Sequence, residues 1–173
     1  MHKSMGASLY VPANHKDLLQ VANGERLTQA RSLIFCTEDA VADRDLSWAL
    51  FNLSVVLQNM HEEVQAERFV RVRNTEVLTR VLAMKGAHKL TGFVIPKATR
   101  QNFESYYRLV RDTDHMLMPT LETSEVFSER EMELFRDLLQ SPGVRNRILA
   151  LRIGGNDLLA LLGLRRPRTM TIY

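Results

Sequence analysis

Two runs of strand-forming residues with a helical segment between them decide the fold: SLIFCT at residues 32–37, and RFVRVRN at residues 68–74. The first run is apolar almost throughout, as is typical of a strand whose two faces are both buried, whereas arginines alternate with valines in the second run. Between the runs, apolar residues recur at steps of three and four, which predicts a helix. These helical positions are Leu46, Leu50, Leu53, Val56, Leu57 and Met60. The whole stretch therefore predicts a strand, a helix and a second, parallel strand.

The same alternation continues along almost the whole chain. Further strands are predicted at Ser8–Pro12, Gly92–Pro96, His115–Thr123 and Ile148–Gly154. Six strand–helix units in a row indicate either a β/α barrel or a doubly wound sheet. The first strand is not followed by a glycine-rich turn, and the Gly154-Gly155 pair lacks the spacing of a dinucleotide-binding fingerprint. We therefore expect a (β/α)8 TIM barrel, of which residues 1–173 cover about the first six units as one domain.

Local signals place some of the predicted helix ends. Asn14 with Asp17 is expected to begin the first helix, and Ser128 with Glu131 has the spacing of a capping box. Gly86 follows Lys85 and is expected to end the third helix.

Composition limits the classes of protein to consider. The 173 residues carry a net charge of only +3 and no run of 18 apolar residues, so no membrane span is expected. The N-terminus lacks the apolar core of a signal peptide. A single cysteine, Cys36, cannot form an internal disulfide, which favours the cytoplasm. Arg165, Arg166 and Arg168 form the one basic cluster, interpreted as a solvated chain end or a contact for phosphate. No basic stripe rich in aromatic residues is present, so no nucleic-acid partner is expected.

Polar residues follow the predicted strands, at the end where a barrel places its catalytic residues. They are Glu38, Asp39, Arg71, Arg73, Asn74, Lys97, Glu122, Asn156 and Asp157. Carboxylates at neighbouring strand ends can hold Mg²⁺, which prefers one or two carboxylates plus water and substrate oxygens. Arginines beside them suit a substrate that bears a carboxylate or forms an enolate. The histidines and the cysteine show no spacing that would indicate zinc.

Most of these residues also have a structural interpretation. Glu122 could interact with a helix dipole, and Asp157 could cap the helix that follows it. Arg71 and Arg73 alternate with valines, so both side chains leave the strand on the same side. One of these arginines could line a site while the other forms an ion pair. Glu38 and Asp39 could cap a loop, Lys97 could form a structural salt bridge, and Cys36 is expected to be a buried apolar residue.

Six short motifs, in this order, resemble those of the HpcH/HpaI aldolase family, in its branch that is similar to the citrate lyase β subunit. The resemblance runs from the first predicted strand to the last. The motifs are Ser8-Leu9-Tyr10-Val11-Pro12-Ala13, Ile34-Phe35-Cys36-Thr37-Glu38-Asp39-Ala40-Val41, Val70-Arg71-Val72-Arg73-Asn74, Phe93-Val94-Ile95-Pro96-Lys97, Leu121-Glu122-Thr123 and Ile153-Gly154-Gly155-Asn156-Asp157-Leu158.

The resemblance implies specific roles. Glu122 and Asp157 correspond to ligands of Mg²⁺, for which Mn²⁺ can substitute. Arg71, or in its place Arg73, corresponds to the arginine that contacts the substrate, with Glu38 and Asp39 as catalytic neighbours. Arg73, Asn74, Lys97 and Asn156 are then expected to bind substrate. The implied reaction is retro-Claisen or retro-aldol cleavage of a carbon–carbon bond in a 3-hydroxyacyl-CoA such as citryl-, malyl- or citramalyl-CoA. A homo-oligomer, a trimer or larger, is also implied.

The sequence departs from the family pattern at several points. Cys36 stands where the family usually has aspartate, and Gly6 and Ala7 stand where an arginine commonly precedes the first strand. The expected barrel also has six of its eight units in these residues, which implies a fragment, a completing second chain or a different closure. Two alternatives therefore remain beside the CoA-ester lyase: an aldolase for a small carboxylic or oxo-acid in a stress-response pathway, and a non-catalytic scaffold.

Overall fold

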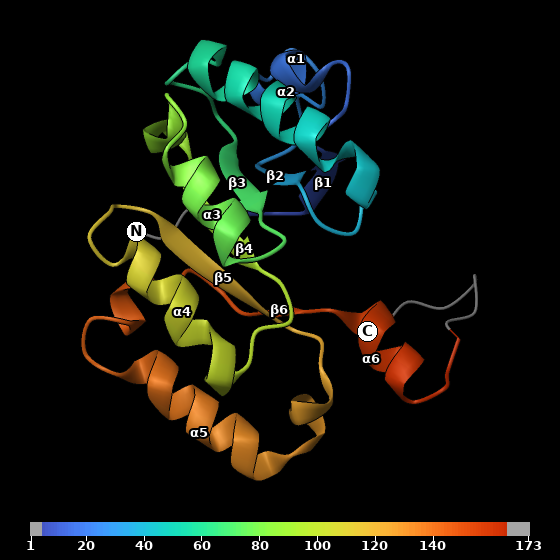
Figure 1. Cartoon of the computed structure of the whole chain (residues 1–173), viewed down its shortest axis with the longest axis vertical. Coiled ribbons are helices and arrows are strands. Elements are labelled where there is room, and N and C mark those ends of the chain that lie inside the picture. The colour runs from blue at the N-terminus through green and yellow to red at the C-terminus, as the bar shows by residue number, and fades with distance from the viewer. Residues whose placement is uncertain (1–4, 166–173) are drawn as a thin grey trace.

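The computed structural model describes residues 5–165, which form six strands and the helices between them (Figure 1). The strands are β1 (Ser8–Pro12), β2 (Ser32–Cys36), β3 (Glu67–Arg71), β4 (Gly92–Ile95), β5 (Met116–Leu121) and β6 (Arg152–Ile153). The α-helices are α1 (Leu18–Ala22), α2 (Leu46–Asn59), α3 (Thr75–Leu82), α4 (Arg100–Val110), α5 (Glu129–Gln140) and α6 (Gly155–Leu161). Short 3-10 turns are η1 (Asp43–Asp45), η2 (Ala87–Lys89), η3 (Ser124–Phe127) and η4 (Arg145–Arg147).

All strand pairs are parallel, and the strands lie in the order β1-β2-β3-β4-β5-β6. A doubly wound sheet would reverse its strand order at a switch point, whereas a barrel adds each new strand on the same side. The sequential order therefore confirms the predicted barrel architecture and excludes the doubly wound alternative.

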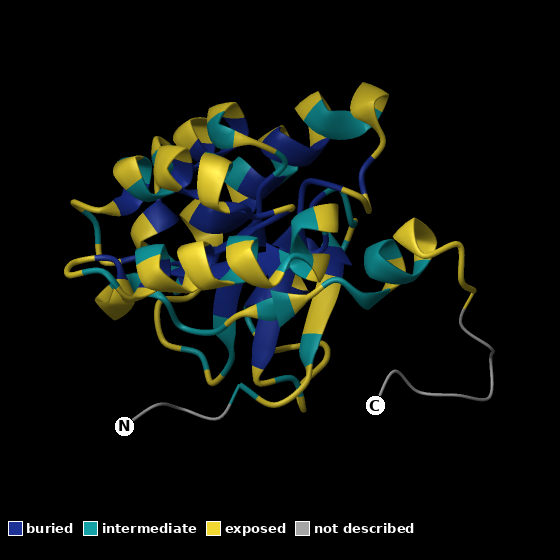
Figure 2. Cartoon of the chain, turned by 90° about the horizontal axis from the view of Figure 1, so that it is seen from below, coloured by how far each residue is buried: buried dark blue, intermediate teal, exposed yellow. Residues whose placement is uncertain are grey.

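The two faces of the sheet bury different side chains. Exposed residues lie on the outer sides of the helices, and buried residues lie in the sheet and on the helix sides that face it (Figure 2). This face of the sheet, toward the helices, holds the larger core, in which Phe35, Val70 and Phe93 are fully buried. The opposite face holds a small cluster with one residue from each of four neighbouring strands: Ile34, Phe69, Val94 and Met118. Such a layer of branched and bulky side chains is the normal filling of a barrel interior.

The sheet curls far enough for a side chain of β1 and a side chain of β6 to meet across the interior. Tyr10 on β1 is the register partner of Ile34, and Arg152 on β6 is the partner of Thr120. The guanidinium carbon of Arg152 lies 5.3 Å from the centre of the Tyr10 ring. Side chains from both ends of the sheet therefore contribute to one interior surface.

Several predicted boundaries are corrected. The last strand is predicted at residues 148–154 but contains two residues, and Ile148 makes only an isolated bridge to Leu117. The first helix begins at Leu18 after Asp17, so the prediction that Asn14 begins it is wrong. The third helix ends at Leu82, before the predicted Gly86. Gly86 is needed for another reason, because a Cβ there would lie 2.0 Å from the carbonyl oxygen of Leu57. The predicted cap at Ser128 is confirmed, since its hydroxyl accepts from Glu131 N at 3.3 Å.

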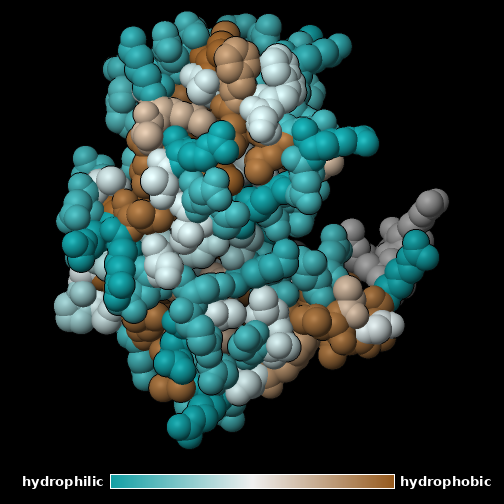
Figure 3. Space-filling view, viewed as in Figure 1, coloured by the Kyte–Doolittle hydropathy of each residue, from teal (hydrophilic) through white to brown (hydrophobic). Residues whose placement is uncertain are grey.

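Helix α6 stands away from the body of the barrel and contains no buried residue (Figure 1). Apolar residues gather over this helix (Figure 3), and Leu161, Leu162 and Leu164 are more than half exposed. In the basic cluster, Arg166 and Arg168 lie outside the described residues. No described helix combines the length and the apolar character that crossing a membrane requires.

Candidate active site

Arg71 is the centre of an ionic network at the carboxyl ends of the strands. Its Nη2 lies 2.8 Å from Glu38 Oε2 and 3.1 Å from both Asp39 Oδ2 and Glu122 Oε1. Arg71 is the last residue of β3 and lies two residues after the inward-facing Phe69, so its side chain enters the barrel interior. Burial lowers the pKa of Arg71, but Glu38, Glu122, Tyr10 and Asp39 outweigh that effect and raise it. Arg71 is therefore a fixed cation.

Lys97 holds two of these carboxylates from the end of β4. Its backbone has φ +46°, a left-handed conformation that is uncommon for a residue with a side chain. In this conformation the Lys97 N–H donates to Glu122 Oε1 at 2.7 Å, while Nζ donates to Glu38 Oε1 at 3.0 Å. The hydrogen bond to Glu38 is the main reason why the pKa of Lys97 is raised. The Asn102 side chain donates to the Lys97 carbonyl at 2.8 Å and secures this turn at the start of α4.

Glu122 and Asp157 form a pair of adjacent carboxylic groups. Glu122 follows β5 directly and is 4% exposed, whereas Asp157 lies in the first turn of α6. Burial raises the pKa of Glu122, the Lys97 N–H and Arg71 lower it, and the charge and hydrogen bond of Asp157 raise it again, with a net upward shift. Gly154 permits this approach, because a Cβ there would lie 2.3 Å from Glu122 Oε2. The alternative of Asp157 as a helix cap is not supported, since Gly154 occupies that position.

A pocket of about 350 Å³ opens beside this pair. Its lining residues include Asp39, Arg71, Glu122 and Asp157, together with Tyr10, Thr120, Arg152, Gly154 and Asn156. Arg71 Nε and Thr120 Oγ1 are buried without a hydrogen-bond partner. Buried polar atoms are rarely left unpaired, so these two are available to a ligand. Tyr10 lies within the first motif and Arg152 directly before the last, but neither is among the predicted site residues. Their inward strand positions are the signal that could have identified them.

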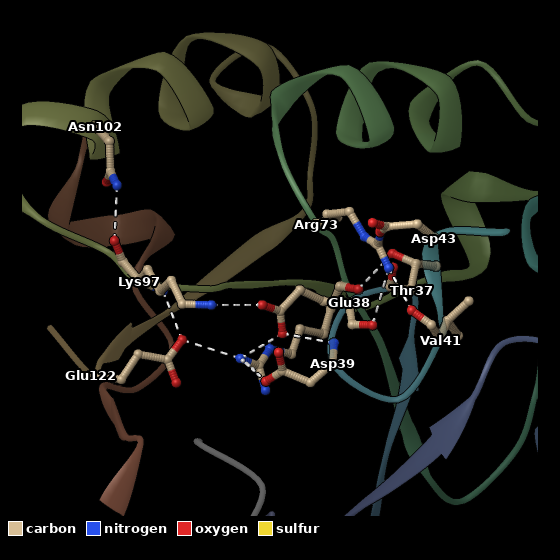
Figure 4. Close-up of polar contacts among 10 residues, drawn as sticks. Thr37, Glu38, Asp39, Val41, Asp43, Arg73, Lys97, Asn102 and Glu122 are labelled. Atoms are coloured by element: carbon tan, nitrogen blue, oxygen red, sulfur yellow. Dashed lines mark hydrogen bonds and ion pairs between the residues drawn. The ribbon is translucent and has the colours of Figure 1, made fainter. Parts of the chain in front are cut away.

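The structure separates the remaining predicted site residues from the pocket. Arg73 donates to the backbone carbonyls of Thr37 and Val41 at 3.3 and 2.5 Å and pairs with Asp43, so it fixes the loop after β2 (Figure 4). Asn74 caps α3 by accepting from Val77 N at 2.9 Å. Of the two arginines, Arg71 lines the site and Arg73 forms the ion pair. Cys36 is buried, as expected.

The donors present fit a hard divalent cation. Among the residues that the structure describes, no group of three or more His, Cys, Asp or Glu side chains is arranged to hold a metal. Mg²⁺, however, commonly uses one or two carboxylates and takes its other ligands from water and substrate. Glu122 and Asp157 supply two carboxylates, and Asp157 lies near enough to raise the pKa of Glu122. A cation between them would offset the repulsion of the two charges.

A parallel β/α barrel whose acidic and basic side chains meet at the carboxyl ends of its strands is an enzyme architecture. Residues 1–173 match the family described as the C-C bond lyase of the TIM-barrel fold. The chain belongs to this family of carbon–carbon lyases, which confirms the predicted kind of enzyme and the predicted TIM-barrel fold.

Three solved structures illustrate what this chain is similar to in fold. Malate synthase from Haloferax volcanii, in a magnesium and glyoxylate complex, is 17% identical with a TM-score of 0.76 over 92% of this chain and 54% of that one. The citrate lyase β subunit from M. tuberculosis, complexed with oxaloacetate and magnesium, is 18% identical with a TM-score of 0.58 over 93% and 63%. RipC from Yersinia pestis is 17% identical with a TM-score of 0.60 over 91% and 61%. The chain thus spans between about half and two thirds of their lengths. No curated protein matches it.

Proposed function

We propose that this chain carries the site of a Mg²⁺-dependent lyase that cleaves a carbon–carbon bond by retro-Claisen or retro-aldol chemistry. One observation carries the proposal: Arg71, with its Nε unpaired, lies between the Glu38–Asp39 pair and Glu122, and Glu122 and Asp157 line the same pocket. Magnesium complexes of structurally similar proteins with glyoxylate and oxaloacetate support the choice of metal and of ligand class.

The residues divide the reaction between them. Asp39 lines the pocket with a side chain that is 58% exposed, so it is the group placed to accept the proton of a substrate hydroxyl. As the proton leaves, the hydroxyl carbon becomes a carbonyl, the neighbouring carbon–carbon bond breaks, and its electron pair forms an enolate on the departing fragment. Arg71 remains charged and donates hydrogen bonds to the enolate oxygen. Glu38, held by Lys97 and Arg71, keeps that guanidinium in position.

Glu122 and Asp157 would hold the Mg²⁺ ion, which supplies Lewis acidity toward the substrate oxygens. The hydrogen bond from Lys97 N to Glu122 Oε1 fixes one carboxylate oxygen, while Oε2 faces Gly154. Asn156, exposed on the first turn of α6, and Lys97, at the rim, remain proposed contacts for substrate.

Two substrate classes follow from this site. The first is a 3-hydroxyacyl-CoA such as citryl-, malyl- or citramalyl-CoA, and the second is a free hydroxy acid, cleaved as an aldolase would cleave it. The small, strongly charged lining of the pocket favours the second class for the portion that enters it. The homo-oligomeric state and the cytoplasmic location stay predictions.

The proposal predicts that Arg71→Lys lowers the turnover of oxo-acid release about 10- to 100-fold, because lysine retains the charge but not the guanidinium fork. Cleavage of the three CoA thioesters and of the free hydroxy acids is measured with Mg²⁺ and with EDTA. Arg80→Lys, on the exposed face of α3, is the matched control and should retain full activity.

Cleavage that EDTA does not reduce, or that Arg71→Lys leaves unchanged, would contradict the proposal. Cleavage of free acids alone would select the aldolase over the CoA-ester lyase.

A further inference from the structure

Arg152 is a cation in the pocket that no acidic side chain neutralises. Among the described residues, no carboxylate pairs with it, and its side chain makes no hydrogen bond. Its guanidinium group lies over the face of the Tyr10 ring, with the guanidinium carbon 5.3 Å from the ring centre. Arg71, in contrast, contacts three carboxylates. The two arginines therefore differ in what they offer a ligand.

Tyr10 holds Arg152 without cancelling its charge. The same ring lies 5.7 Å from the guanidinium carbon of Arg71, so both arginines use its electron-rich π system. A cation–π contact orients a guanidinium but leaves its N–H donors free to bind an anion. Arg152 and Tyr10 come from the last and first strands, so this arrangement exists only because the sheet curls.

The charges in the pocket point to the kind of ligand that Arg152 would bind. Glu38 and Asp39 balance Arg71 and Lys97, and the proposed Mg²⁺ ion balances Glu122 and Asp157. Among these groups, Arg152 is then the positive charge that no carboxylate of the protein balances. Two unpaired polar atoms also line this pocket, Arg71 Nε and Thr120 Oγ1, on residues that are 8% and 3% exposed. Thr120 is the register partner of Arg152, so its side chain leaves the sheet on the same side.

We infer that Arg152, oriented by Tyr10, binds a second carboxylate of the substrate, so that the pocket selects small acids with two anionic groups over those with one. The hydroxy-acid end lies at Arg71, Glu122 and Asp157, and the second carboxylate lies at Arg152. This inference rests on the proposed function, because it takes the position of the reacting end from it. Arginine suits this role, since its fork of donors matches a planar carboxylate.

Calorimetric binding of malate and lactate in the presence of Mg²⁺ tests the inference. The two acids share a 2-hydroxy-acid end, and malate has one additional carboxylate. The parent chain should bind malate roughly tenfold more tightly than lactate, as expected for one charge-assisted contact. Arg152→Gln should lower malate affinity to that of lactate and leave lactate affinity within about twofold. Arg152→Lys should restore part of the preference, and Arg80→Gln should match the parent.

Three results would overturn the inference. They are equal affinity of the parent for the two acids, absence of malate binding by the parent, and an equal loss of affinity for both acids in Arg152→Gln. Circular dichroism establishes that the variants are folded, and the Arg152→Lys comparison decides the matter if the glutamine variant is not. Mn²⁺ titration separates the two claims. A parent that binds Mn²⁺ and treats both acids alike refutes the role of Arg152 alone, whereas a folded parent that binds no Mn²⁺ refutes the proposed metal site.

Discussion

The position of Glu122, buried and beside Asp157, makes ionisation of its carboxyl group unfavourable. Its pKa is raised above the ordinary value of 4.5, first by burial and then by the nearby charge of Asp157. An acid with a raised pKa holds its proton more tightly in the folded state than in the unfolded state. Ionisation of Glu122 therefore lowers stability above the folded pKa, and this loss disappears below pH 4.5. Without metal, ionised Glu122 consequently lowers the stability of the folded chain at neutral pH but not in acid.

Asp157→Asn should raise the Tm of the metal-free chain at pH 7, because it removes the like charge next to Glu122. A gain of about 1 kcal/mol corresponds to about 2–4 °C for a chain of this size. The difference from the parent should shrink below pH 4.5, where Glu122 is protonated in both chains. Calorimetric melting with EDTA across this pH range measures it.

Asp137→Asn, at an exposed position of α5, serves as the control and should change Tm little at any pH. A Tm that falls in Asp157→Asn, or a difference that is the same in acid and at neutral pH, would contradict this account of the carboxylate pair.

Much of the candidate site can be predicted at the scale of single residues, because polar residues that follow apolar strands stand out in the sequence. Arg71, Glu38, Asp39, Glu122 and Asp157 all meet in the structure. The sequence could not distinguish Arg71 from Arg73, since strand alternation places both on one side. The distinction arises where β3 ends: Arg71 is its last residue, and Arg73 lies in the loop beyond it.

At the scale of elements, the turn between β6 and α6 controls how closely Glu122 and Asp157 can approach each other. Gly154 donates its N–H to the Leu121 carbonyl at 2.9 Å, which brings the turn against the end of β5. A Cβ on Gly154 would lie 2.4 Å from the Cβ of Glu122. Either the Glu122 side chain or the turn would have to move to accept it.

Gly154→Ala should therefore weaken Mn²⁺ binding on the order of tenfold, with a loss of stability of about 1–3 kcal/mol from overpacking. Gly24→Ala is the matched control, because Gly24 has φ +74° and nothing within 4 Å of an added Cβ. It should lose roughly 1 kcal/mol through backbone strain and retain its Mn²⁺ affinity. Titration calorimetry and melting of both variants compare the two effects. Unchanged Mn²⁺ affinity in a folded Gly154→Ala chain would contradict the claim that this turn controls the metal site.

The positions of the elements follow from hydrophobic periodicity, but their ends depend on tertiary contacts. The strands β1, β2 and β4 are found within one residue of their predicted bounds, whereas β3 ends at Arg71, three residues before its predicted end. Strand β6 contains only Arg152–Ile153, and before it Ile148 makes only an isolated bridge to Leu117. Gly86 illustrates the other limit, because its close approach to Leu57 on α2 has no local signature in the sequence.

At the scale of the whole molecule, the order of the strands matters more than any single contact. Sequential parallel strands bring all carboxyl ends to one rim, where residues that are far apart in sequence meet. Glu38 and Glu122 both contact Arg71, although Arg71 and Glu122 are 51 positions apart. The sequence predicts this rim through its alternating units. It does not predict that Tyr10 and Arg152 meet across the interior, because that contact depends on how strongly the sheet curls.

The most direct test of the central claim is calorimetric titration of the metal-free chain with Mn²⁺, beside Glu122→Gln. Glutamine retains the size of the side chain and removes its charge. The account predicts one Mn²⁺ site in the parent chain and none in Glu122→Gln, with unchanged circular dichroism. Equal binding by both chains, or no binding by a folded parent, would contradict the proposal that Glu122 and Asp157 hold the metal.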